Sequence, residues 1–310
     1  MILAANAVWD IVSSSTMYES TVRLAALLAF AAVGEWVAER AGTLNISVEA
    51  MILTGSFAAA MGASTTGNVV IGVLYGVAAG MAVAFVQGNL SHRLAANQFV
   101  VGLTLNVLAV GLTAYLNAQL RPTAHRAAVW RVPGLVHVPL VGRALFGQTW
   151  ILYLLYPLVP AAWWLVYRTR WGLEVRSVGE NPQAADVSGI HVNARRRQAV
   201  LVAGATSGLA GALLSLGLAS FGADGVGGRG FIALTAVIFG GWTLRGTIAG
   251  ALVFGVFDAM RFALPSLGYK VNVQLLSSLP FVMALATMLL FARRTRAPGA
   301  LARSFVRGLT

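Results

Sequence analysis

Long apolar runs separated by short polar stretches make up most of the chain. Runs such as 69–90 and 99–120 are close to the roughly 20 residues that a helix needs to cross a bilayer. Segment 229–243 is short for a full crossing, which indicates a broken or re-entrant helix. We therefore predict an all-α, polytopic integral membrane protein with about nine transmembrane segments, at 22–38, 48–64, 69–90, 98–118, 149–167, 198–219, 229–243, 246–263 and 276–292.

The polar stretches suggest how the chain is oriented. A single transmembrane domain is expected over residues 1–310, with a polar loop at 168–197 and a basic tail at 293–310. The loop holds six arginines and the tail five. Because cytoplasmic segments are enriched in Lys and Arg, both are predicted to be cytoplasmic. Parity then places loop 119–148 outside, although it contains Arg121, Arg126, Arg131 and Arg143.

The N-terminal segment 1–20 differs from the apolar runs that follow it. It lacks the basic start of a cleaved signal peptide. We predict a short interfacial helix there, with Trp9 and Tyr18 at the level of the lipid headgroups.

Composition excludes several classes of protein. Hydrophobic residues make up 58% of the chain and charged residues only 10%, against roughly 25% charged in soluble domains. The formal charge of +12 comes from arginines at helix ends and loops, so we expect no nucleic-acid partner. There is no cysteine, and the four histidines are scattered. With Lys270 as the single lysine there is no phosphate loop, and 225–230 (GVGGRG) follows no strand. We expect neither catalysis nor a bound metal or cofactor.

The most polar part of the 168–197 loop reads GENPQAADVSGI, residues 179–190. Asn181 suits a helix N-cap, and Pro182 suits the first helical position. Gly189 provides a left-handed stop about two turns later. This pattern predicts a short, capped helix that is either an ordinary loop helix or a docking element for a soluble partner.

A second polar stretch, 34–55, interrupts the first two predicted spans. Glu35 and Glu39 share a helix face, and the helix is expected to break after Gly42. Asn45 and Glu49 stand where a second half-helix would start, which is a common way to face a polar ligand. Two interpretations remain open: the acidic side chains line a path for a ligand, or they are interfacial caps in water together with Arg40.

Isolated polar residues lie inside other spans. Thr104 and Asn106 interrupt 98–118 and either bond between helices or line a passage. Asp224 and Asp258 are weaker candidates, and Asp258 could simply pair with Arg261, three residues on. Glycines and other small residues at four-residue spacing indicate close helix packing, at Gly72, Gly76 and Gly80; Gly204 and Gly208; Ser207 and Gly211; Gly246 and Gly250.

Several motifs resemble those of ABC-importer permeases for nucleosides and simple sugars, in the ribose/galactoside/branched-chain amino acid permease superfamily. They are EWVAERAGTLNISVEAMILTGSFAA, FVVGLTLNVLAVGLTAYL, WGLEVRSVGENPQAADVSGIHVNARRRQAVLVAGATSGLAGALLSLG and GGRGFIALTAVIFGGWTLRGTIAGALVFG, in this order. The likeness covers most of residues 20–292, and the length is similar to that of the shorter nucleoside-type paralogue. Ser47 and Ala50 stand where the family commonly has glycine, and Thr243 and Leu244 replace its usual proline-containing turn.

The resemblance implies half of a translocation pathway, most readily for nucleosides. The implied partners are a cytoplasmic ABC ATPase that carries ATP and Mg²⁺, a second permease paralogue, an extracytoplasmic substrate-binding lipoprotein and membrane lipid. The implied location is the bacterial cytoplasmic (inner) membrane. The resemblance assigns coupling to the ATPase to Gly179, Glu180, Asn181, Pro182, Ala185, Gly189 and Ile190. It assigns the translocation path to Glu35, Asn45, Glu49, Thr104, Asn106 and Phe231.

Beside this interpretation, a purely structural membrane subunit remains open, and so do two kinds of transporter. The first is a permease of the same kind that imports simple sugars. The second is an ion-coupled secondary transporter that uses Glu35, Glu39 or Glu49 as a proton or cation site.

Overall fold

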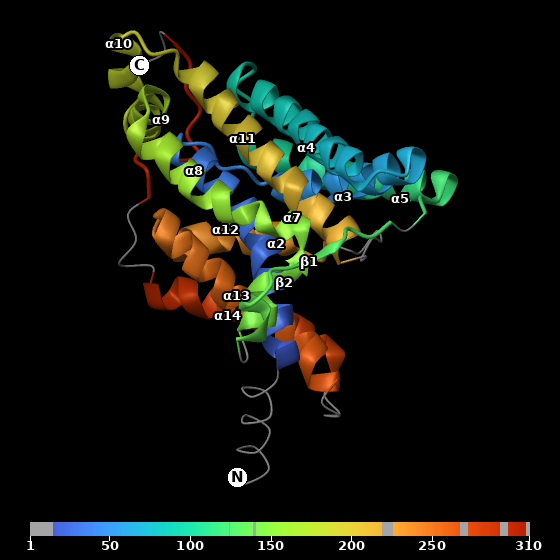
Figure 1. Ribbon diagram of the computed structural model, residues 1–310. Helices are drawn as coiled ribbons and strands as arrows, with labels where there is room; N and C mark the ends of the chain where they lie inside the picture. Colours follow the sequence, from blue (N-terminus) through green and yellow to red (C-terminus); the bar gives the residue numbers. More distant parts are fainter. Residues whose placement is uncertain are drawn as a thin grey trace.

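The computed structural model describes residues 15–123, 125–138, 141–218, 226–266, 272–291 and 297–307, and this part is almost entirely helical (Figure 1). The helices are α2 (Ser15–Arg40), α3 (Val48–Thr66), α4 (Val69–His92), α5 (Gln98–Leu120), α6 (Gly142–Phe146), α7 (Trp150–Tyr153), α8 (Leu155–Arg168), α9 (Arg170–Glu180), α10 (Pro182–Val187), α11 (Val192–Ala212), α12 (Arg229–Phe239), α13 (Leu244–Ser266) and α14 (Val273–Phe291). Short elements are the 3₁₀ turn η1 (Leu135–His137), the π-helical turn η2 (Leu213–Gly217), and the antiparallel strands β1 (Val129–Arg131) and β2 (Gly147–Thr149).

Helices occupy all nine segments predicted to cross the membrane. Within the described residues, five helical stretches are long and apolar enough to span a bilayer: Ser15–Arg40, Val69–His92, Gln98–Leu120, Trp150–Arg168 and Val192–Gly217. The last of these combines α11 with η2, and the fourth combines α7 with α8. The protein is therefore a polytopic α-helical membrane protein, as predicted.

The prediction for the N-terminal segment is partly wrong. Residues 15–20 are the first turns of α2, continuous with the first span, because no helix-breaking residue separates Ser15 from Val22. Trp9 lies outside the described residues, as does Asp224.

Helix α2 forms the centre of the molecule. Its side chains are buried from Leu24 to Glu39, and it packs against α11, α12 and α13. Helices α3, α4 and α11 pack against one another beside it (Figure 1). A helix that is apolar on all sides, as α2 is over residues 24–33, is stable only when neighbours enclose it.

The predicted small-residue stripes lie at close contacts between helices. A Cβ built on Gly80 of α4 would lie 2.9 Å from the Cα of Gly208 on α11. A Cβ on Gly76 would lie 2.9 Å from the carbonyl oxygen of Gly55 on α3. Larger side chains at these positions would push the backbones apart, which confirms that the stripes serve packing.

The two ends of α2 meet different parts of the chain. Near its start, Arg23 donates to the side chain of Gln148 in β2, 2.8 Å away. At its end, the carbonyl of Ala41 accepts from Arg196 at the start of α11. Loop 119–148 and the 168–197 loop thus lie at opposite ends of the bundle, as parity predicts, and Figure 1 shows α9 and α10 far from the first turns of α2.

Candidate functional site

Helix α10 has the caps that the sequence predicts. The Asn181 side chain accepts from the backbone N–H of Ala184 at 3.0 Å, and Pro182 occupies the first helical position. Gly189 follows with φ +85°, a left-handed conformation that glycine adopts without strain. Glu180 is the last residue of the preceding helix α9, which the sequence analysis did not identify.

One face of α10 is packed and the other is open. Ala185 is buried in a small apolar cluster with Val178 of α9 and Val192 of α11, and Ile190 packs against this cluster. The side chain of Val187 is 90% exposed. The face of α10 that carries Val187 is therefore open to solvent in the described part of the chain, whereas the face that carries Ala185 is packed.

The predicted break between α2 and α3 is present, and polar side chains hold it. We call residues 41–47 the α2–α3 linker. The carboxylate of Glu35 accepts from the backbone N–H of Asn45 at 3.2 Å and from the Asn45 side chain at 3.0 Å. Glu35 and Glu39 are fully buried, so the interpretation of these two residues as interfacial caps in water is wrong.

Helix α5 fixes the same linker at two points. Asn106 of α5 donates to the carbonyl of Ile46 and accepts from the N–H of Ala50, both at 2.9 Å. The N–H of Leu44 donates to the side chain of Gln98 at 2.8 Å. Backbone groups that lack helical partners at this depth must be paired by side chains, and these residues pair them. Of the two roles predicted for Asn106, bonding between segments is the one observed.

Glu49 connects α3 to the start of α12. Its two carboxylate oxygens accept from the backbone N–H groups of Gly228 and Gly230, at 2.8 and 2.7 Å. A negative side chain at a helix N-terminus satisfies the unpaired amides of the first turn and complements the helix dipole. Gly230 allows this approach, because a Cβ there would lie 2.5 Å from the backbone nitrogen of Glu49.

Segment 229–243 is a short helix followed by a tight turn. Helix α12 ends at Phe239, and Gly241 and Trp242 both have positive φ before α13 begins. Trp242 donates its indole N–H to Glu39, and its carbonyl accepts from the indole of Trp36 at 2.9 Å. The prediction of a broken helix here is therefore confirmed.

Asp258 pairs with Arg261, as predicted, and lies closer to a second arginine, Arg229. Arg261 lies 3.7 Å from its carboxylate, but Arg229 approaches to 2.8 Å, with both side chains almost fully buried. The sequence analysis did not identify Arg229 or Trp242 as polar partners inside the bundle. Their partners lie 29 and 203 residues away, beyond any local pattern.

The two remaining predicted path residues lie apart from this network. Thr104 is exposed on α5, and its hydroxyl donates to the carbonyl of Val100 in the same helix. Phe231 on α12 is 38% exposed. Of the six predicted path residues, Glu35, Asn45 and Asn106 are buried together, and Glu49 connects α3 to α12. The side chains of Thr104 and Phe231 reach the surface of the chain.

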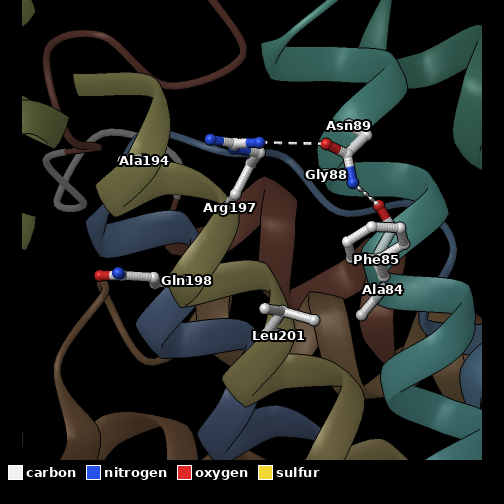
Figure 2. Close-up of a pocket in the computed structure, with 8 residues that line it drawn as sticks. All are labelled: Ala84, Phe85, Gly88, Asn89, Ala194, Arg197, Gln198 and Leu201. Atoms are coloured by element: carbon white, nitrogen blue, oxygen red, sulfur yellow. Dashed lines mark hydrogen bonds between the residues drawn. The ribbon is translucent and has the colours of Figure 1, made fainter. Parts of the chain in front are cut away.

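A small cavity of about 160 Å³ lies between α4 and α11, near the end where α10 is found. Figure 2 shows Arg197 of α11 pointing across it to Asn89 of α4, with Leu201, Ala84 and Phe85 below. Arg197 donates to the Asn89 side chain at 3.1 Å. In the described residues, no group of three or more His, Cys, Asp or Glu side chains could hold a metal ion.

Comparison with known proteins identifies the family. Residues 17–292 match the family described as the permease component of branched-chain amino acid transport systems. A putative glucose ABC transporter permease of Haloferax volcanii is 34% identical, over 94% of this chain and 97% of its own. A nucleoside ABC transporter permease of Lactococcus lactis is 30% identical over 88% and 91%, and a guanosine ABC transporter permease of Bacillus subtilis is 29% identical over 95% and 97%. No solved structure matches the chain significantly.

These matches extend over nearly the whole chain and agree with the predicted motifs. They decide against the ion-coupled secondary transporter as the class of this protein. The family comprises transmembrane components, which are not enzymes and hold no cofactor, and which work with a separate ATPase and a substrate-binding protein. The chain belongs to the permease family of branched-chain amino acid transport systems and is the membrane-spanning permease subunit of an ABC importer.

Proposed function

We propose that this permease imports nucleosides and forms half of the translocation pathway together with a second permease paralogue. Two of the relatives described above carry nucleosides or guanosine in their names, and both cover most of this chain. Simple sugars are the second candidate, since the relative at 34% identity is a putative glucose permease. The proposed location is a bacterial cytoplasmic membrane, with α9 and α10 on the cytoplasmic side and loop 119–148 outside.

In this proposal α10 is the coupling helix that the ATPase grips. The observation that carries it is the exposed Val187 on a helix whose other face is packed at Ala185. The caps at Asn181 and Gly189 keep this helix rigid, so that a push on its exposed face moves α9 and α11 with it. Gly179, Glu180, Pro182 and Ile190 complete the proposed coupling segment.

The path residues divide into two roles. Thr104 and Phe231, with exposed side chains, are proposed to face the passage or the partner permease across it. Glu35, Asn45, Glu49 and Asn106 are proposed to hold the wall of that passage. The side chains of Glu35, Glu49 and Asn106 bond to the backbone of the linker or of the start of α12, and the Asn45 side chain bonds to the Glu35 carboxylate. The exposed apolar faces of α4 and α5 are available to lipid or to the second permease.

A change at Val187 tests the coupling role. Val187→Asp places a charge in the proposed interface, and an unpaired buried charge costs about 3 kcal/mol or more, roughly a hundredfold in affinity. The permease itself is expected to fold normally, since the side chain is 90% exposed. We expect the ATPase to be lost on purification and uptake to stop, whereas Val187→Leu keeps both. Retention of ATPase and transport by Val187→Asp would contradict the docking role of α10.

Uptake measurements test the substrate. Cells that carry the whole transporter operon are supplied with radiolabelled guanosine or glucose, each with the other compound in unlabelled excess. We expect guanosine uptake that needs the ATPase and is blocked by other nucleosides and not by glucose. Glucose uptake without nucleoside uptake would replace the nucleoside proposal with the sugar proposal and leave the family assignment intact.

A further inference from the structure

Arg196, at the start of α11, is completely buried and joins two distant segments of backbone. Its guanidinium donates to the carbonyl of Ala41 at 3.2 Å in the α2–α3 linker. It also donates to the carbonyls of Arg303 at 2.6 Å and Ala300 at 3.5 Å, near the C-terminus. A guanidinium tolerates burial only when its N–H groups are paired, and its planar fork suits several acceptors at once. The three carbonyls are therefore held in a fixed arrangement around Arg196.

The C-terminal segment 297–307 contains turns and neither helix nor β-strand. We call this piece of chain the tail strand, and it lies directly on the linker. The N–H of Ala302 donates to the carbonyl of Gly42 at 3.1 Å, and the N–H of Ala300 donates to that of Gly179 at 2.9 Å. Gly42 has φ +83°, and a Cβ there would lie 3.0 Å from the Arg196 guanidinium and 3.1 Å from the carbonyl oxygen of Ala300. Close backbone approach thus brings the tail strand, the linker and the end of α9 together.

The tail strand also contacts α10. Phe305 packs on the cluster that contains Ala185, and Arg307 lies 3.2 Å from the carboxylate of Asp186 on the same helix. The side chain of Asn193 donates to the Phe305 carbonyl at 3.3 Å. One short segment therefore contacts the proposed coupling helix at one end and the α2–α3 linker at the other.

We propose that the tail strand transmits motion from α10 to the α2–α3 linker, and that Arg196 is the positioning residue that couples the two. The inference rests on the proposed role of α10 as the ATPase-docking helix. Beyond the tail strand, the linker is bonded to Glu35, Gln98 and Asn106, so that its displacement alters the start of α3. Helix α10 also packs on α9, whose Gly179 lies against Gly42, so the tail strand connects α10 to the linker alongside the contact through α9.

The decisive variant is Arg196→Gln, with Arg197→Gln as its matched control. Arg197 is the next residue and bonds to Asn89 across the α4–α11 cavity and to the carbonyl of Asn193, whereas Arg196 bonds to the tail strand itself. The complete complex of both permeases and ATPase is placed in proteoliposomes, and ATP hydrolysis and nucleoside uptake are measured together. With Arg196→Gln we expect ATPase association and hydrolysis within about twofold of wild type, and about tenfold less uptake per ATP. The control is expected to keep the wild-type ratio.

A second variant guards against a folding defect. Removal of residues 297–310 leaves Arg196 in place and is expected to give the same loss of uptake per ATP. Equal uptake per ATP in wild type and both variants would overturn the proposal. A parallel fall of hydrolysis and uptake, in proportion to the amount of complex, would also overturn it. Loss of coupling on truncation alone would overturn the role of Arg196.

These outcomes are distinguishable from a failure of the proposed docking helix. If Val187→Asp detaches the ATPase while Arg196→Gln transports normally, α10 docks as proposed and the tail strand does not transmit its motion. If Val187→Asp has no effect, the docking role fails first, whatever the tail variants do.

Discussion

The contact between Glu49 and the start of α12 gives the sharpest prediction of a stability change. Glu49→Gln keeps the shape of the side chain but replaces one acceptor oxygen by an N–H₂ group that faces a backbone N–H. One of the two bonds, at 2.7 and 2.8 Å, is lost, and the other becomes neutral. A hydrogen bond to a charged group contributes about 1.5–3 kcal/mol and a neutral one about 1 kcal/mol. The expected loss is therefore about 3 kcal/mol.

Whether the loss reaches about 3 kcal/mol depends on the bonds that the separated helices can form in the membrane. Bonds between transmembrane helices often contribute only about 0.6 kcal/mol, because separated helices find other partners. The amides of Gly228 and Gly230 belong to the first turn of α12 and have no intrahelical acceptor, so the larger value is expected. At about 2 °C per kcal/mol, the melting temperature falls by about 6 °C.

The assay is the temperature at which half of the detergent-solubilised permease remains monodisperse. Glu19→Gln is the matched control, since Glu19 forms a partly exposed ion pair with Arg23 at 3.6 Å and such pairs near the surface contribute at most about 1 kcal/mol. A melting temperature for Glu49→Gln within 1 °C of the control would refute the reasoning, because the two carboxylate bonds could not then be holding α12.

Two further changes test the packing and the buried ion pair. Gly80→Leu inserts a side chain where even a Cβ would lie 2.9 Å from Gly208, so the α4–α11 contact should open at a cost of about 3 kcal/mol. Gly111→Leu should be neutral, since a Cβ there would have no neighbour within 4 Å, and the monodisperse fraction after solubilisation compares the two variants. Asp258→Asn leaves the Arg229 guanidinium without its carboxylate and should cost about 3–5 kcal/mol, and adding Arg229→Gln should restore part of it. A double variant no more stable than Asp258→Asn would show that the pair does not account for the loss.

Features that depend on neighbouring residues were predictable from the sequence. Helix α10 was predicted with its N-cap, first-turn proline and left-handed stop, because Asn181, Pro182 and Gly189 act on backbone within three residues of themselves. The break after Gly42 and the short α12 were predicted for the same reason, since glycine and run length are local signals.

Features that depend on distant residues were not predictable. The sequence places Glu49 at a helix start but gives no sign that its carboxylate meets Gly228, 179 residues away. Arg196 contributes to the arginine count of a cytoplasmic loop, and nothing local marks it as buried. Helix α9 was not predicted although the sequence contains a local signal for it. Val175 and Val178 stand at helical spacing, which indicates a helix with one buried face.

One set of buried polar residues forms a continuous route from the tail strand to α12. Arg196 and the tail strand hold the linker at Ala41 and Gly42, and Glu35 holds it at Asn45. Asn106 holds the linker at Ile46 and also bonds the first turn of α3, where Glu49 reaches α12. These bonds pair buried polar groups of the linker and of the first turns of α3 and α12, so the segments cannot slide independently without unpairing them. A displacement at α10 should therefore reach α12 through the linker, by exchange of these bonds.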